Sequence, residues 1–357
     1  MGENARKRLG AGYSTDRYQE RFLAAAEMAK EMVRGAKQMA QSLNSSLSSL
    51  HCPGPNFTHR SHNPIQILGS SVNMVDIPYI TDWISKQTDV YRADERSAKP
   101  GNRTHGAGLE SRGIPQQPLR GEVEIRRCFP SAKQLIVTGF HGLTEARKDP
   151  AYRRIGRECD LWVPDSIAPV LIARWRGIKN AVRTPGAEIM TAFMERANER
   201  GFKSYFYGDS ETTLSALREK LERTYPGHKV AGTFSPPFRR LSPEEEQEHI
   251  DMINAARPDV LWVGLGLPKQ DEWIYRCKDR LRVPVAAGVG AAFGFLAGTT
   301  RRAPRCICDA GLEWAYMVLT KPKRTLKRVF IEGADFLWHV LLEEVRPRKK
   351  SRIESDS

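Results

Sequence analysis

The sequence lacks any long apolar run, since no stretch reaches the roughly 18 uninterrupted apolar residues of a membrane-spanning helix. No apolar segment follows the basic residues near its start, so we expect neither a membrane span nor a secretory signal. The six cysteines are scattered, and the one close pair, Cys306 and Cys308, has no second pair with which to form a zinc site. We therefore expect reduced thiols in a cytosolic protein.

The sequence also lacks the strongest glycine signatures of nucleotide binding, the Walker Gly-Lys-Ser/Thr and the complete three-glycine dinucleotide fingerprint. Carboxylates are few relative to cations: 56 Lys and Arg against 42 Asp and Glu leave a net charge of +14. Such a balance favours an anionic partner, which could be nucleic acid, a phosphorylated substrate or an acidic membrane surface. We expect no nucleic-acid partner, because no recognised reader module is present.

Several segments lack apolar periodicity, and they set the expected domain boundaries. Residues 1–62 predict a disordered or partly helical extension, and residues 87–120 predict a disordered insertion within a domain spanning 63–300. Residues 301–345 predict a basic helical appendage, and residues 346–357 a disordered tail.

Within the domain, short apolar runs alternate with helical patterns, which predicts a parallel sheet with helices on both faces. A small unit comes first, with strands at 64–69 and 72–75 and a helix at 78–86. The main strands are expected at 134–138, 161–163, 204–207, 230–233, 260–263 and 283–287. The helices are expected at 167–175, 187–200, 212–224, 243–256 and 272–281.

A glycine-containing loop follows the strand at 260–263 and opens a helix, where backbone N–H groups and a positive helix end can face phosphate. Its residues are Gly264, Gly266, Pro268, Lys269 and Gln270. Tight strand-to-helix packing explains a lone Gly-x-Gly equally well, but Lys269 and Gln270 add a cation and an amide donor. A second glycine loop containing Gly290 follows the next strand, and it could equally be a close-packed turn.

Two further polar residues follow strand ends. Asp165 comes after the strand at 161–163 and could act as a general base, or simply as the N-cap of the helix at 167–175. His141 follows the strand ending at Thr138, and it could contact a ligand or have a structural role.

Residues 301–328 carry eight cations and two carboxylates, a net charge of +6, with Trp314 and Tyr316 between them. Aromatic residues beside Lys and Arg are typical of a helix at a membrane surface, so we expect this segment to contact an anionic membrane. A solvated charged face is the alternative.

Taken together, these motifs resemble the WecG/TagA/CpsF glycosyltransferases over residues from about Gln134 to Phe330. The matching residues are His141-Gly142, Asp160 to Asp165, Arg183 with Gly186 and Met190, Tyr205-x-Tyr207-Gly208, Tyr225-Pro226-Gly227, Val263 to Gln270, Gly288 to Phe293, Ala297-Gly298, Arg302-Ala303-Pro304, Gly311 to Trp314, and Lys321-Pro322-x-Arg324. The family transfers an N-acetylmannosamine-type or related sugar from a nucleotide diphosphate to a polyprenyl-diphosphate-linked acceptor.

The resemblance implies a Rossmann-like sheet that binds a UDP-sugar, inversion at the anomeric carbon, and no required metal or cofactor. It places the candidate base on Asp165 and implies a membrane-contacting C-terminal appendage. It also implies peripheral attachment to the inner face of the plasma membrane and leaves a homo-oligomer open. The expected substrate-binding residues are Thr138, His141, Arg183, Gly186, Tyr207, Gly208, Gly264, Gly266, Pro268, Lys269, Gln270, Gly290 and Arg302.

This sequence departs from the family pattern in the strand-end loops. Thr138-Gly139-Phe140 lacks the asparagine of the usual Thr-x-Asn, and Ser166 stands where the family's Pro-Asp-Gly loop has glycine. Phe293-Gly294 lacks the carboxylate of the usual Phe-Asp. A nucleotide-sugar-binding scaffold with impaired catalysis is therefore the alternative to an active enzyme.

Overall fold

Two units make up the chain in this computed structural model, which describes residues 64–98, 130–300 and 332–345. The first unit spans His59–Arg302, and the second combines Met1–Thr58 with Ala303–Ser357. The sheet lies in the first unit, and the described part of the second is helix α16 (Gly333–Val345) with the residue before it. The predicted extension at 1–62, the tail at 346–357 and most of the predicted appendage lie outside the described residues.

Six parallel strands form the sheet, in the spatial order β4-β3-β8-β7-β5-β6. The strands are β3 (Lys133–Thr138), β4 (Leu161–Pro164), β5 (Lys203–Gly208), β6 (Lys229–Phe234), β7 (Val260–Gly264) and β8 (Val285–Gly288). All six predicted strands are present, with boundaries shifted by at most two residues. The predicted α/β fold with a Rossmann-like parallel sheet is confirmed.

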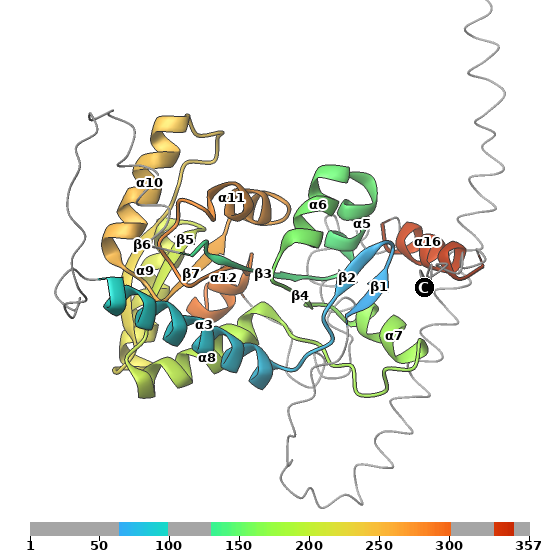
Figure 1. Cartoon of the computed structure of the whole chain (residues 1–357), viewed down its shortest axis with the longest axis horizontal. Helices are drawn as coiled ribbons and strands as arrows, with labels where there is room; N and C mark the ends of the chain where they lie inside the picture. Colours follow the sequence, from blue (N-terminus) through green and yellow to red (C-terminus); the bar gives the residue numbers. More distant parts are fainter. Residues whose placement is uncertain (1–63, 99–129, 301–331, 346–357) are drawn as a thin grey trace, which may run out of the picture. The chain divides into compact units, whose positions relative to one another are not determined.

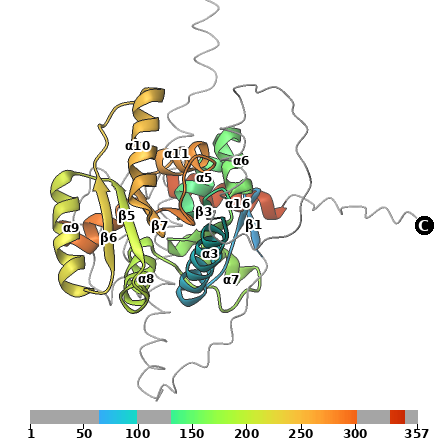
Figure 2. The same cartoon turned by 60° about the vertical axis from the view of Figure 1, so that its left-hand side comes forward.

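Helices cover both faces of the sheet (Figure 1). One face packs against α3 (Ile77–Ala98), α8 (Gly186–Arg200), α9 (Glu211–Thr224) and α12 (Ala292–Ala297). The other packs against α10 (Pro243–Ala256) and α11 (Lys269–Cys277), and Figure 2 shows these two layers from a second side. Side chains of β7 alternate between the two cores: Trp262 belongs to the first, and Leu261 and Val263 to the second. Burial on both faces explains why the strands are continuously apolar.

A small hairpin protects the edge of the sheet at β4. Its strands are β1 (Ile65–Ile67) and β2 (Ser70–Val72), joined by Leu68 and Gly69, which both have positive φ. After β2, the Asn73 side chain accepts a hydrogen bond from the Trp162 N–H at 2.9 Å, and the Asn73 N–H donates to the Trp162 carbonyl at 2.7 Å. Residues 73–75 are therefore not part of a strand, contrary to prediction, because Asn73 bonds to β4 instead.

Helix α3 is longer than predicted, and the residues 87–98 assigned to a disordered insertion are helical. The sequence there lacks apolar periodicity, but tertiary contacts replace it. Thr88 and Tyr91 are buried, and Arg92 donates to both oxygens of the buried Asp259, with Nε–Oδ1 at 2.7 Å and Nη2–Oδ2 at 2.6 Å. The rest of the predicted insertion lies outside the described residues.

Three more helices lie near the β4 edge of the sheet: α5 (Phe140–Lys148), α6 (Pro150–Glu158) and α7 (Ile167–Trp175).

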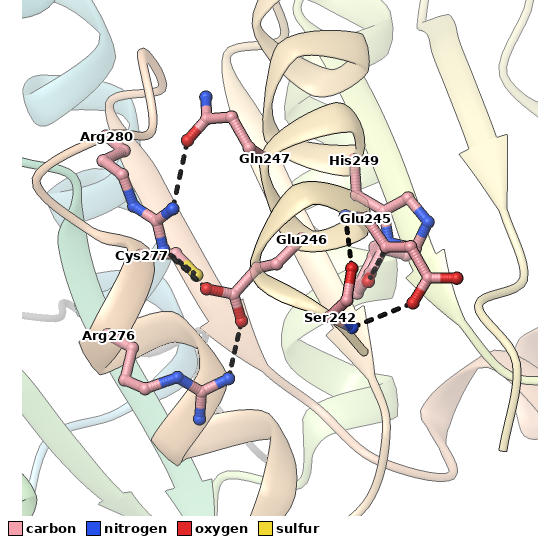
Figure 3. Close-up of polar contacts among 9 residues, drawn as sticks. Ser242, Glu245, Glu246, Gln247, His249, Arg276, Cys277 and Arg280 are labelled. Carbon is pink, nitrogen blue, oxygen red and sulfur yellow. Dashed lines mark hydrogen bonds and ion pairs between the residues drawn. The ribbon is translucent and has the colours of Figure 1, made fainter. Parts of the chain in front are cut away.

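An ion-pair cluster joins α10 to α11. Glu246 on α10 accepts hydrogen bonds from Arg276 on α11 at 2.7 Å and from Arg280 at 2.6 Å (Figure 3). Burial opposes ionisation of Glu246, but these bonds outweigh it and lower the pKa of its carboxyl. The contact fixes α11, whose N-terminus carries the glycine loop, against α10.

Among the helices of residues 64–98, 130–300 and 332–345, none is both long enough and apolar enough to cross a bilayer.

Replacing Arg92 by alanine is expected to lower the free energy of unfolding by about 1–2 kcal/mol, because it leaves the buried Asp259 carboxylate without its charged partner. The value is below that for a fully buried pair because Arg92 is 35% exposed. Urea denaturation measures the change. The matched variant Arg96→Ala, one turn along α3 and exposed, is expected to stay within about 0.5 kcal/mol of the wild type. Equal losses in both variants would contradict this role of Arg92.

Candidate active site at the carboxyl edge of the sheet

The carboxyl ends of all six strands lie at one edge of the sheet, because the strands are parallel. Helices on opposite faces follow neighbouring strands there: β5 leads to α9 on one face, and β7 leads to α11 on the other. Ligands of open α/β sheets bind where neighbouring connections diverge in this way. Most of the predicted site residues lie in these strand-end loops.

Asp165 occupies the loop after β4 and is half-buried. Its N–H donates to the Thr138 carbonyl at the end of β3 at 3.1 Å. Its Oδ1 accepts a hydrogen bond from the N–H of Gly186, the first residue of α8, at 3.2 Å. The positive end of the α8 dipole thus faces this carboxylate. Asp165 does not cap α7, because the N-cap position of α7 is Ser166.

Ser166 joins the loops that follow β3 and β4. Its Oγ accepts a hydrogen bond from the N–H of Phe140, the first residue of α5, at 3.3 Å. Gly139 permits this approach, since a Cβ there would lie 2.4 Å from Ser166 Oγ. Ser166, which stands where the resemblance leads us to expect glycine, therefore holds the start of α5, whose second residue is His141.

Thr138 and His141 lie at the two sides of this junction. The Thr138 side chain is buried against α5, where a Cβ at Gly142 would come within 2.3 Å of its Cγ2. His141 is half-buried, and its ring lies 4.1 Å from that of Phe140. His141 is therefore at the strand-end edge, whereas Thr138 lies beneath it.

Glycines let three strand-end loops approach one another backbone to backbone. The closest approach is at Gly208, which has φ +120°. A Cβ there would lie only 2.6 Å from the carbonyl carbon of Gly264, so a larger residue would not fit. A Cβ at Gly264 would in turn lie 3.2 Å from the Gly290 carbonyl oxygen and 2.8 Å from the Phe293 ring. Gly186 approaches the loop after β8 as well, where its Cβ would meet the Val289 carbonyl oxygen at 3.3 Å. These contacts bring the loops after β5, β7 and β8 and the start of α8 together.

The loop after β7 leads directly into α11. Gly266 has φ +79°, Pro268 precedes the helix, and the Gln270 N–H donates to the Gly266 carbonyl at 3.0 Å. Lys269, the first residue of α11, is exposed, whereas Gln270 is 2% exposed. Within the described part of the chain, Gln270 Oε1 has no hydrogen-bond partner. The loop thus combines an exposed cation with a buried carboxamide at the N-terminus of a helix, an arrangement suited to an anionic ligand.

Asp271 is a buried polar residue behind this loop that the sequence analysis missed. Its Oδ2 accepts a hydrogen bond from the Tyr152 hydroxyl of α6 at 2.6 Å, and its carbonyl accepts one from Gln134 Nε2 at 3.0 Å. Burial raises the pKa of Asp271 to about 7, although the Tyr152 bond opposes the rise. Its position three residues before Ile274, on the inner side of α11, was the available signal.

One predicted residue, Tyr207, lies apart from this group. The Tyr207 side chain is fully buried in the core, where its hydroxyl bonds to His249 Nδ1 at 2.9 Å and its ring stacks on Trp273. Arg183 is half-buried in the segment between α7 and α8. Arg302 lies outside the described residues. Asp165 and Gly186 are joined by a hydrogen bond, and the backbones of Gly208, Gly264 and Gly290 meet close to the Gln270 side chain.

The position at which the family pattern has a carboxylate is closely packed here. Gly294 is buried in α12, and its carbonyl accepts hydrogen bonds from the N–H groups of Gly298 and Thr300. A Cβ at Gly294 would lie 2.7 Å from Thr300 Oγ1. A side chain at this position would therefore require Thr300 to move.

The parallel sheet with helices on both faces defines an α/β protein of the Rossmann-like class. The family model described as "Glycosyl transferase WecG/TagA/CpsF family" matches residues 123–350. The chain belongs to this family, and the protein is a glycosyltransferase. The predicted resemblance is thus confirmed.

Two similar proteins carry the same name, "N-acetylglucosaminyldiphosphoundecaprenol N-acetyl-beta-D-mannosaminyltransferase". The protein of Bacillus spizizenii is 29% identical over 180 residues, which cover 50% of this chain and 68% of the relative. The protein of Bacillus subtilis is 26% identical over 179 residues, with the same shares of the two chains.

Stability is expected to depend on pH through Asp271. Its folded-state pKa lies above the ordinary value of about 3.9, so the folded protein holds this proton more tightly than the unfolded chain. The resulting stabilisation is complete below about pH 4 and is lost as the pH rises through about 7. Asp271→Asn does not undergo this loss. The free energy of unfolding of the variant is therefore expected to rise relative to that of the wild type as the pH increases over this range. Urea denaturation at several pH values measures it.

Tyr152→Phe serves as the companion variant, because it removes a bond that lowers the pKa of Asp271. The pH dependence is expected to persist in this variant and to extend to higher pH. A constant difference between Asp271→Asn and the wild type at every pH would show that Asp271 does not titrate in this way.

Proposed function

We propose that the protein transfers an N-acetylhexosamine, of the N-acetylmannosamine type, from a UDP-sugar to a polyprenyl-diphosphate-linked sugar, with inversion, in the biosynthesis of a bacterial cell-surface polysaccharide. The observation that carries the proposal is the position of Asp165, a carboxylate held between a strand end and the N-terminus of α8 beside the glycine loops. The names of the two Bacillus relatives support the choice of sugar and of acceptor.

Asp165 acts as the general base in this mechanism. The acceptor hydroxyl attacks the anomeric carbon of the donor, a new C–O bond forms, and the bond between that carbon and the diphosphate oxygen breaks. Asp165 takes the hydroxyl proton during the attack, and the electron pair of the broken bond leaves with UDP. A single displacement of this kind inverts the anomeric centre.

The leaving diphosphate gains charge as the bond breaks, and donors already in place lower the energy of that state. Lys269, together with backbone N–H groups of the loop that begins at Gly264, is well placed for this role at the start of α11. The Gln270 carboxamide can contact the sugar or the diphosphate, and Arg183 and Arg302 are further cations for the same anion.

Asp165→Asn is expected to lower kcat about a hundredfold to ten-thousandfold while UDP still binds, because the amide cannot take a proton but can still accept the Gly186 N–H bond. Turnover with UDP-N-acetylmannosamine and a polyprenyl-diphosphate-linked N-acetylglucosamine measures the rate, and calorimetry with UDP measures binding.

Asp149→Asn is the matched control, since Asp149 also accepts an N–H bond at a helix start, from Ala151 at 2.8 Å, but caps α6. Its turnover should equal that of the wild type. Full activity in Asp165→Asn would exclude Asp165 as the base. UDP binding by the wild type without transfer from any donor would support the nucleotide-sugar-binding scaffold instead.

We also propose that the protein works at the cytosolic face of the plasma membrane and that residues 301–328 attach it there. Their net charge of +6 supports this proposal, since each Lys or Arg near an anionic surface contributes about 1 kcal/mol. A polyprenyl-linked acceptor would lie in the same membrane.

Lys321→Ala combined with Lys323→Ala is expected to weaken binding of the full chain to phosphatidylglycerol vesicles about fivefold for each lysine. UDP affinity should not change. Vesicle flotation measures the binding, and the control combines Lys220→Ala on α9 with Lys229→Ala on β6. Equal effects of the two pairs would mean that overall charge, rather than this segment, sets membrane binding.

A further inference from the structure

Helix α7 is apolar on its exposed side as well as on its buried side. Pro169, Val170, Ile172 and Ala173 are buried, but Leu171 and Trp175, one turn apart, are 43% and 62% exposed. Val182, in the segment after the helix, is 38% exposed. Large apolar side chains exposed together on one helix often mark a surface that contacts a second apolar phase or a partner.

Within the segment between Asp165 and Glu188, the charges are of one sign. Residues 166–187 contain Arg174, Arg176, Lys179 and Arg183 and no carboxylate. Arg174 and Lys179 are exposed, next to the apolar side chains in the sequence. Apolar and aromatic side chains beside cations match an anionic lipid surface, in which Trp lies at the level of the headgroups and Lys and Arg extend toward the phosphates.

The segment after α7 is held against the helix. Arg174 Nε donates to the Ala181 carbonyl at 3.0 Å, and the Ile178 N–H donates to the Ala173 carbonyl at 2.9 Å. Arg176 also donates to the Gln66 carbonyl of the hairpin. The exposed apolar side chains are therefore presented by a fixed structure, which lowers the entropic cost of binding.

Both ends of the segment from Ser166 to Gly186 lie next to Asp165. Ser166, the N-cap of α7, follows Asp165 directly, and the segment ends at Gly186, whose N–H bonds to the Asp165 carboxylate. The N-terminus of α7 and the end of this segment thus both adjoin the proposed base.

We propose that Leu171, Trp175 and Val182, with Arg174 and Lys179, form a membrane-docking surface, the α7 surface, that rests on an anionic bilayer. Nine residues of helix, at about 1.5 Å each, are too short to cross the membrane, so α7 lies in the plane of the headgroups. Docking there presents the diphosphate-linked end of a membrane-embedded acceptor to the edge that holds Asp165. The role of the acceptor rests on the proposed function, whereas binding of the α7 surface to lipid does not.

A lipid surface explains these features better than a second copy of the chain does. A protein partner would have to place carboxylates against the exposed cations Arg174 and Lys179, whereas an anionic bilayer meets them without any specific arrangement. Self-association through this surface is therefore treated as an outcome that overturns the proposal.

The central experiment is vesicle flotation of the full chain with Leu171→Ser combined with Trp175→Ser. Binding to vesicles of phosphatidylcholine and phosphatidylglycerol is expected to weaken at least about tenfold, because two apolar side chains no longer enter the interface. Both side chains are exposed, so the fold should persist. The matched control is Phe238→Ser, which removes an aromatic residue that is 94% exposed in the loop after β6, at the opposite edge of the sheet. Its binding should not change.

Two single lysine variants distinguish binding to anionic headgroups from nonspecific adsorption to vesicles. Lys179→Ala is expected to weaken binding to vesicles that contain phosphatidylglycerol about fivefold. The control, Lys220→Ala on α9, is expected to bind these vesicles as the wild type does. Trp175 also provides a direct measurement. Brominated lipids should quench the tryptophan fluorescence of the wild type by a larger fraction than that of Trp175→Phe.

Transfer assays keep this proposal apart from the proposed function. With the acceptor in vesicles, the double serine variant should lose transfer in proportion to its lost binding, whereas transfer to a short, water-soluble acceptor should equal that of the wild type. If the wild type transfers to neither acceptor, the proposed function fails while the flotation result still decides the α7 surface.

Two outcomes would overturn the proposal. One is flotation of the double serine variant at wild-type affinity. The other is weaker vesicle binding together with a lower molecular mass in sedimentation analysis, which would identify the α7 surface as an interface between copies of the chain.

Discussion

A parallel strand can follow another only after the chain has crossed back over the sheet, and this constraint governs the rest of the domain. Each crossover here contains a helix, so both faces are covered, and the strands become continuously apolar. The same constraint places every strand-to-helix loop at one edge. The hairpin β1–β2 bonds to the β4 edge through Asn73, where an open strand would otherwise expose its backbone.

The candidate site is supported from behind by buried polar groups. Asp165 is fixed by two backbone bonds from different elements, and Ser166 ties its loop to the start of α5. Behind the glycine loop, Asp271 bonds to Tyr152 on α6, so α11 and α6 are joined at the level of the site. Groups held in this way need little rearrangement when charge develops on a ligand, as the proposed transfer from a nucleotide diphosphate would require.

The cations of the chain are concentrated in several segments. Lys269 belongs to the strand-end edge, residues 301–328 carry a net charge of +6, and Arg174 and Lys179 are exposed in the segment that follows Asp165. An enzyme that joins a soluble, anionic donor to a lipid-linked, anionic acceptor would use cations in both places. The α7 surface differs from a merely basic one because Trp175 and Leu171 are exposed within it.

Alternating apolar runs and helical patterns were enough to predict the strands, the helices on both faces and the edge at which Asp165, Gly264 and Gln270 lie, because these depend on local periodicity and on the geometry of parallel sheets. The ordered motifs indicated the family. Only the tertiary structure decided that residues 87–98 are helical, since Arg92 finds Asp259 far along the chain. It also decided that Tyr207 is in the core, that Asp165 meets α8 rather than capping α7, and that Asp271 is buried. Burial and long-range contacts set these outcomes, and no local pattern records which distant residues will meet.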